Sequence, residues 1–287
     1  MSILLIDIGN TRVKWARFDG QRLGRQQAAA FAEWKARDFA IEVMGARRGA
    51  RTLRSQRSTA ATSRGVQRIV VSSVAGGRVN RLLAAAARHA HGPKPEFVES
   101  QRRAGGVTTA YMEPWRLGVD RFAMAIGAHN LAKARAVCII SVGTALTIDL
   151  VDGKGRHRGG AILPAPHLMV ESLLTRTNGI RRRASGSSSG SGPVAVPGAP
   201  NRGVNIFART TRSAIEQGAL LAAAAAVDRG AEEARQLLGR RPLLLLTGGG
   251  AEAVAPLVRS RFVSVPGLVL WGLAVLASEG KQLSGNS

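Results

Sequence analysis

The sequence has a single cysteine, Cys138, and only 4% aromatic residues. One cysteine forms no internal disulfide, which fits a reducing compartment. The longest weakly polar stretch, residues 263–278, contains Pro266 and falls short of the ~20 apolar residues that span a bilayer. No basic segment precedes the first apolar run, and Asp7 interrupts that run, so we expect no signal peptide. We therefore expect a cytoplasmic protein with no membrane partner.

Acidic residues are also scarce: 18 Asp and Glu stand against 41 Lys and Arg, a formal net charge of +23. Such an excess ordinarily points to nucleic acid or another anionic partner. Here the arginines are scattered, with denser runs at 47–57 and 176–183, and neither run is interleaved with aromatics that could stack on bases. The sequence has no helix-turn-helix or zinc-finger spacing. We therefore do not expect nucleic acid to be the main partner.

The chain is long enough, at 287 residues, for about two domains. Aliphatic runs alternate with helix-compatible segments, a pattern that predicts an α/β fold. The expected strands are residues 3–8, 13–18, 67–74, 96–99, 137–140, 146–151, 160–163 and 243–246. The expected helices are residues 31–44, 79–91, 117–135, 209–229, 251–258 and 269–277.

Two strand–turn–strand segments are similar to each other. The sequence DIGN at 7–10 and the sequence SVGT at 141–144 each follow an aliphatic strand and precede a return strand. This similarity predicts two duplicated halves, residues 1–133 and 134–287. A Gly/Ser/Pro-rich segment near 184–203 has too few apolar residues to pack, so we expect it to be a flexible insertion in the second half.

Three aliphatic strands run directly into small-residue turns, at 7–11, 143–147 and 247–250. Glycines at such positions let a polyphosphate approach backbone N–H groups, and Asn or Thr side chains add neutral donors. The sequence has neither the P-loop nor the Rossmann spacing. The pattern resembles the remaining well-known solution, the actin-like ATPase fold. This is the ribonuclease H-like architecture of the hexokinase and heat-shock-ATPase superfamily, in which two duplicated halves hold ATP in a cleft.

In that architecture the first-strand carboxylate holds Mg²⁺, commonly through water, and Asp7 occupies this position. The alternative is a solvated turn residue, but a carboxylate at the end of a run as apolar as ILLI needs a partner. The five histidines show no metal-ligand spacing. Cys138 lies within an apolar strand, which indicates a buried, unreactive thiol.

The segment YMEPWRLGVDR at 111–121 supplies a second group of functional residues. Asp120 and Arg121 lie at the expected start of a helix, where N–H groups favour anions. Phosphoryl transfer to an alcohol needs a carboxylate that receives the hydroxyl proton and a cation that orients the acceptor. These two residues offer both. A purely structural alternative makes Asp120 a helix cap and Arg121 a surface charge.

Five motifs together resemble the type III pantothenate kinases, the group that includes the Bvg accessory factor homologues. They are DIGNT at 7–11, YxxPxRLGxDR at 111–121, GTAxTxD at 143–149, GGxIxP at 159–164 and TxxAIxxG at 211–218. The resemblance implies ATP-dependent phosphorylation of pantothenate to 4'-phosphopantothenate, the first step of coenzyme A biosynthesis. It also implies a cytoplasmic homodimer that uses Mg²⁺.

The resemblance further implies roles for individual residues. Asp120 matches the catalytic proton acceptor. The implied ATP-binding residues are Asp7, Ile8, Gly9, Asn10, Thr11, Arg12, Val13, Lys14 and Thr144. The implied pantothenate-binding residues are Tyr111, Gly118, Val119, Asp120, Arg121 and Thr211, the last of which comes from the partner subunit in this family. The turn at 247–250 fits the adenosine side.

The chain departs from the family in two places. Family members commonly carry an Asp that binds a monovalent cation where this chain has Ser141, so a requirement for K⁺ or NH₄⁺ stays open. The segment near 184–203 precedes Thr211 and could change how that residue is presented. Two other functions also stay open: a non-catalytic nucleotide-sensing or transcription-accessory protein on the same fold, and a kinase for another small alcohol.

Overall fold

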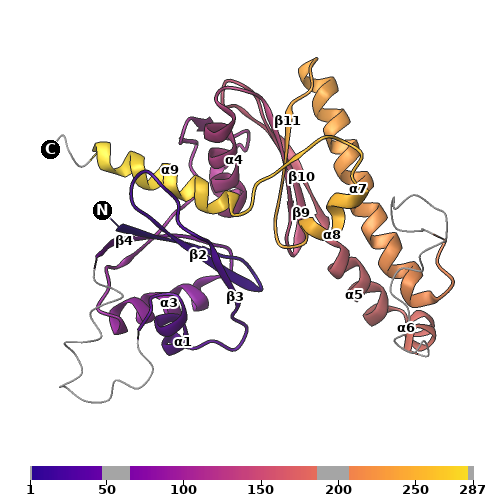
Figure 1. Ribbon diagram of the computed structural model, residues 1–287, viewed down its shortest axis with the longest axis horizontal. Coiled ribbons are helices and arrows are strands. Elements are labelled where there is room, and N and C mark those ends of the chain that lie inside the picture. Colours follow the sequence, from indigo (N-terminus) through magenta and orange to yellow (C-terminus); the bar gives the residue numbers. More distant parts are fainter. Residues whose placement is uncertain (1, 47–64, 186–206, 284–287) are drawn as a thin grey trace. The chain divides into compact units, whose positions relative to one another are not determined.

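A computed structural model describes residues 2–46, 65–185 and 207–283 (Figure 1). The basic run at 47–57 and residues 186–203 of the expected insertion lie outside the described residues. The chain forms two compact units. Of the described residues, the first unit contains those within 1–133, 155–157 and 267–283, and the second contains those within 134–154 and 158–266. No helix in the described part of the chain is both long and apolar enough to cross a membrane.

The first unit is built on a five-stranded sheet of order β3-β2-β1-β4-β5. β1 is antiparallel to β2 and parallel to β4, so this central strand is hydrogen-bonded to a neighbouring strand along each of its two edges. Alternate residues Leu4, Ile6 and Ile8 face a core with α1 and α3, which lie on one side of the sheet in Figure 1. The elements are β1 (Ser2–Ile8), β2 (Arg12–Phe18), β3 (Gln27–Ala30), α1 (Ala36–Glu42), β4 (Val66–Ser73), α3 (Gly77–His89) and β5 (Pro95–Phe97).

The other side of this sheet packs against α4 and α9. These two helices approach closely because Gly127 and Gly272 meet at their crossing, where a Cβ on Gly272 would overlap the carbonyl oxygen of Ala123. The remaining elements of the unit are the hairpin β6 (Arg103–Ala104) and β7 (Val107–Thr108), a 3₁₀ turn at Pro114–Arg116, α4 (Val119–Ala132) and α9 (Leu268–Leu283).

The second unit repeats the topology of the first. Its sheet has the order β10-β9-β8-β11-β12, which is the first sheet's order when strands are counted from β8. Cys138, Ile140 and Val142 of the central strand β8 pack in a core with α7. The elements are β8 (Val137–Val142), β9 (Ala145–Val151), β10 (His157–Pro164), α5 (Pro166–Arg176), α6 (Asn178–Ser185), α7 (Thr211–Leu238), β11 (Leu243–Thr247), α8 (Ala251–Val254), a 3₁₀ turn at Ala255–Leu257 and β12 (Val263–Ser264).

The repeated topology confirms the predicted α/β fold with two duplicated halves. Assigning all of residues 134–287 to the second half was wrong, because α9 packs on α4 and on the first sheet and therefore belongs to the first unit. The sequence alone does not show that the chain returns to the first unit after the second. His157, the first residue of β10, and the two residues before it also belong to the first unit.

Each predicted helix differs in extent from the observed one, and α5 and α6 were not predicted. The helix expected at 31–44 covers only Ala36–Glu42, because residues 31–35, which follow the missed edge strand β3, contain a turn in which Trp34 N donates to Phe31 O. The helix expected at 209–229 continues to Leu238 and ends at Gly239, whose φ of 66° provides the left-handed C-terminal cap. Hydrophobic periodicity marks a helix core better than it marks the ends.

Candidate active site

Lys14, Asp7 and Ser72 occupy paired positions on the neighbouring strands β2, β1 and β4. Side chains at paired positions point to the same side of a sheet. Because the flanking residues Ile8 and Val71 face the core with α1 and α3, these three side chains point to the side covered by α4 and α9. The first sheet thus places an ammonium, a carboxylate and a hydroxyl in one row.

Asp7 is a buried carboxylate that the protein satisfies only in part. Asp7 is 5% exposed, and Nζ of Lys14 lies 3.7 Å from Oδ2 of Asp7. Within the described part of the chain, no donor reaches Oδ1. Burial raises the pKa of Asp7 to about 6, Lys14 opposes this shift, and the negative charge of Asp120 adds to it. The site therefore holds two carboxylates close enough to repel each other, with an oxygen suited to a cation or an ordered water.

Ser72 is a member of this row that the sequence analysis missed. It is fully buried, and its Oγ also has no hydrogen-bond partner among the described residues. The available signal was a polar residue at the end of the apolar run RIVVSSV, the same pattern that identified Asp7. Its position beside Asp7 depends on the register of β1 and β4, which the sequence does not state.

The predicted first phosphate loop is a tight turn between β1 and β2. Gly9 N donates to Arg12 O at 3.0 Å, and the side chains of Asn10, Thr11 and Arg12 are exposed. Ile8 and Val13 are buried in the core, so only their backbone groups could contact a nucleotide.

The other two predicted turns meet in the second unit. Gly143 N donates to Ala145 O at 2.9 Å in the turn that carries Thr144. Gly250 N donates to Val142 O at 2.9 Å, which ties the turn at 247–250 to this loop. Gly248 has a φ of 99° and lies so close to Val142 O that a Cβ would overlap it, so both its conformation and its packing require glycine.

The start of α4 presents Asp120. Gly118 is the N-cap residue, so the alternative of Asp120 as the cap is wrong, and Asp120 lies instead in the first helical turn. Asp120 Oδ1 accepts a hydrogen bond from Arg121 N at 2.8 Å. A Cβ on Gly118 would lie 2.7 Å from that oxygen. Glycine at 118 therefore leaves space for the Asp120 carboxylate. Val119 is the residue between them in the sequence.

Arg121 is buried, with 4% exposure, so its interpretation as a surface charge is wrong. Its Nη1 donates to the hydroxyl of Tyr111 at 3.0 Å, and its guanidinium lies 5.8 Å from the centre of the Tyr111 ring. On the same tyrosine, the ring of His157 lies 6.0 Å away at an interplanar angle of 30°. The sequence analysis singled out Tyr111 and Arg121 but gave His157 no role.

The predicted site residues divide between the units. The first unit brings together Asp7 with Lys14 and Tyr111 with Arg121, and the charge of Asp120 acts on Asp7. Thr144 and Thr211 belong to the second unit, where Thr211 is the first residue of α7.

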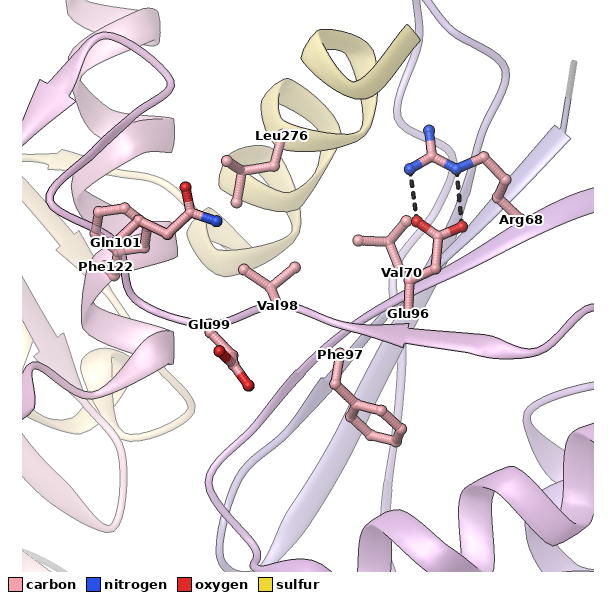
Figure 2. A pocket seen from close by; sticks show the side chains of 9 residues that line it. All are labelled: Arg68, Val70, Glu96, Phe97, Val98, Glu99, Gln101, Phe122 and Leu276. Carbon is pink, nitrogen blue, oxygen red and sulfur yellow. Dashed lines mark hydrogen bonds and ion pairs between the residues drawn. The ribbon is translucent and has the colours of Figure 1, made fainter. Parts of the chain in front are cut away.

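A cavity of about 290 Å³ also lies in the first unit, and Figure 2 shows its lining. Arg68 there pairs with both carboxylate oxygens of Glu96, at 2.9 and 2.7 Å, and donates to Ala277 O at 2.8 Å. These bonds occupy the cation, while Glu99 adds another negative charge. The cavity is therefore poorly suited to an anionic nucleotide or a carboxylate substrate. Its lining residues are Arg68, Val70, Glu96, Phe97, Val98, Glu99, Gln101, Phe122 and Leu276.

The family model and the two curated relatives described here all name type III pantothenate kinase. The sequence model for type III pantothenate kinase matches residues 3–233. A type III pantothenate kinase from Stenotrophomonas maltophilia is 35% identical over 278 residues, which cover 96% of each chain. One from Herminiimonas arsenicoxydans is 34% identical over 277 residues, 96% of this chain and 97% of the relative. Among solved structures, ROK hexokinase from Thermus thermophilus is 16% identical with a TM-score of 0.41, covering 98% of this chain and 100% of that chain.

Proposed function

The chain belongs to the type III pantothenate kinase family, and we propose that it transfers the γ-phosphoryl group of ATP to the primary hydroxyl of pantothenate. The product is 4'-phosphopantothenate, and the reaction begins coenzyme A biosynthesis. The observation that carries the proposal is the buried Asp7 carboxylate beside Lys14, whose Oδ1 has no donor among the described residues, together with the hydrogen bond from the buried Arg121 to Tyr111.

On the nucleotide side, residues 7–14 form the proposed first phosphate loop, and Thr144 supplies a second contact. The exposed side chains of Asn10 and Thr11 and the glycine turn support this role. The buried Oδ1 of Asp7, which no donor reaches in the described residues, fits Mg²⁺ or one of its waters. When bound, Mg²⁺ would neutralise charge on the phosphate oxygens. Lys14 would hold the other side of the Asp7 carboxylate and keep it oriented.

On the acceptor side, Asp120 is the proposed proton acceptor. The hydroxyl oxygen of pantothenate attacks the γ-phosphorus, its proton passes to the Asp120 carboxylate, and the bond to the leaving oxygen breaks to release ADP. The position of Asp120 in the first turn of α4 supports this role, because the helix dipole favours negative charge there. Arg121 and Tyr111 would orient the acceptor through charge and hydrogen bonding, with Gly118 and Val119 contributing backbone contacts.

Replacing the proposed proton acceptor tests this function. We expect Asp120→Asn to lower turnover with pantothenate by about 10²–10⁴-fold, the effect of a lost general base, and to leave ATP binding nearly unchanged. The assay couples ADP release to a spectroscopic signal and identifies 4'-phosphopantothenate by mass spectrometry. The matched control is Glu113→Gln, an exposed carboxylate paired with Arg116, which should keep wild-type turnover. Unchanged turnover in Asp120→Asn would exclude the proposed role.

The two open alternatives are tested with the same preparation. A panel of pantothenate, pantetheine and sugars identifies a kinase for a different alcohol. A nucleotide-sensing or transcription-accessory protein would release no ADP with any of them. DNA titrations at two salt concentrations test whether such a protein binds nucleic acid, since phosphate-driven binding weakens steeply with salt.

We propose a weak monovalent-cation requirement, on the basis of the chemistry around Ser141. Ser141 is paired with Thr147 on β9 and Thr247 on β11, so the row contains three neutral hydroxyls. Neutral hydroxyls bind K⁺ or NH₄⁺ less strongly than a carboxylate does. We expect similar turnover in K⁺ and in a bulky organic cation, and a gain of K⁺ dependence in Ser141→Asp. Loss of activity without K⁺ in the wild type would contradict this.

We also propose that the chain functions as a homodimer in which Thr211 reaches the partner's acceptor site. The helices α5 and α7 pack against each other, yet α5 buries none of its residues, and Leu168, Leu173 and Leu221 on the two helices are 36–41% exposed. Exposed apolar side chains of this kind favour burial against another protein surface. Light scattering should give a dimer, and Leu168→Glu combined with Leu221→Glu should shift it toward monomer with loss of turnover.

A further inference from the structure

His157 occupies a fixed position in the first unit. It is 3% exposed and is the first residue of β10. The two residues before it are bound to the β6–β7 hairpin: Thr108 N donates to Gly155 O at 2.9 Å, and Arg156 forms a parallel bridge with Thr108. Gly155, with a φ of 76°, lies so close to Gly106 O that a Cβ would overlap it. The backbone that carries His157 therefore has little freedom to move.

The imidazole of His157 contacts the ring of Tyr111 at 6.0 Å with a 30° tilt. The same tyrosine is held at its hydroxyl by Arg121 Nη1, at 3.0 Å. Its backbone is also anchored, because Arg102 Nη1 donates to Tyr111 O at 3.0 Å and Tyr111 N donates to Thr109 Oγ1 at 3.2 Å. These contacts fix the backbone, the ring and the hydroxyl of Tyr111 separately.

We propose that His157 is a positioning residue for the acceptor substrate and acts through Tyr111, an inference that rests on the proposed function. The Tyr111 hydroxyl accepts a hydrogen bond from Arg121, so its own hydrogen is directed elsewhere. A partly exposed tyrosine in this state donates to a polar group of the acceptor, such as a carboxylate, amide or hydroxyl oxygen. His157 limits the rotation of the ring about its χ angles and so selects the direction of this donor.

The proposal distinguishes His157 from a residue that only fills space. Loss of the imidazole should weaken acceptor binding by about 3- to 10-fold, the range that corresponds to one aromatic pair. Tyr111 belongs to the acceptor side of the proposed site, so the KM for ATP should stay constant. A general packing defect would instead change both KM values and the unfolding temperature together.

The experiment measures KM for pantothenate, KM for ATP and kcat in His157→Ala, His157→Leu and His157→Phe. Leucine retains an apolar side chain at the buried position without a planar ring, and phenylalanine restores a ring. We expect the KM for pantothenate to rise 3- to 10-fold in the Ala and Leu variants and to return to within about twofold of wild type in the Phe variant. His89→Ala, an exposed histidine at the end of α3, is the control and should match wild type.

A second arm places His157→Leu in a Tyr111→Ala background. Residues that act through one another show non-additive effects, so the leucine substitution should add no further rise in KM for pantothenate there. An additive rise, or a wild-type KM for pantothenate in His157→Leu alone, would overturn the positioning role while leaving the proposed function intact. If wild-type protein forms no 4'-phosphopantothenate, the proposed function fails and this inference fails with it.

Discussion

The substitution Asp7→Asn should stabilise the protein in the absence of ligands while abolishing its response to MgATP. Asp7 is 5% exposed, and within the described residues its Oδ1 has no donor. Asparagine has nearly the same shape and carries no charge. The substitution therefore removes the cost of a buried carboxylate and removes the proposed magnesium contact at the same time.

The magnitude follows from the pKa of Asp7, which burial raises from 3.8 to about 6. Between these two values the folded protein holds a proton that the unfolded chain has released, so the free energy of unfolding falls as pH rises through this range. The rise in the pKa from 3.8 to about 6 lowers the free energy of unfolding by about 3 kcal/mol above pH 7. We expect Asp7→Asn to gain up to this amount at pH 8 and to match wild type below pH 4.

Thermal unfolding of both proteins between pH 4 and pH 8 measures the difference, with about 2 °C expected per kcal/mol for a chain of this size. Repeating the scan at pH 8 with MgATP should raise the midpoint of wild type but not that of Asp7→Asn. Glu113→Gln provides the control for removing one exposed carboxylate. A difference between Asp7→Asn and wild type that is the same at pH 4 and pH 8 would refute a raised pKa at Asp7.

Three further substitutions or probes test other parts of the structure. Gly272→Ala should destabilise the first unit by about 1–3 kcal/mol in urea unfolding, because the added methyl overlaps Ala123 O at the α4–α9 crossing; a stability equal to wild type would contradict this packing. Arg121→Lys should raise the KM for pantothenate by roughly tenfold, because an ammonium cannot both donate to Tyr111 and lie against its ring as the guanidinium does; an unchanged KM would contradict that contact. Burial raises the pKa of Cys138 to about 12, so a thiol reagent at pH 8 should label it only after denaturation, and rapid labelling of native protein would be inconsistent with its position in β8.

The sequence predicted those features that depend on neighbours along the chain. Glycine turns after aliphatic strands, the duplicated strand–turn–strand pattern and the helix that begins near Asp120 are local patterns, and the structure confirms all three. Ser72 and His157 were missed because their surroundings come from other segments. Ser72 lies beside Asp7 only through the register of β1 and β4, and His157 meets Tyr111 across 46 positions of the sequence. The position of α9 on the first unit was missed for the same reason.

Equivalent rows of the two sheets differ in charge, so one duplicated scaffold can serve two tasks in the proposed reaction. In the first sheet the row across the second, first and fourth strands of the topology is Lys14, Asp7 and Ser72. In the second sheet the same row is Thr147, Ser141 and Thr247.

The first row combines opposite charges with a buried carboxylate whose pKa burial raises. Such a row favours a cation and hence the metal-bound end of a polyphosphate. The second row offers hydroxyls, which can donate to or accept from a nucleotide without adding charge. Ser141 stands where the first sheet has Asp7, so Ser141→Asp would give the second row the carboxylate that it lacks. A carboxylate there should turn a row of neutral hydroxyls into one that favours a cation, and the gain of K⁺ dependence expected for this variant tests that division between the rows.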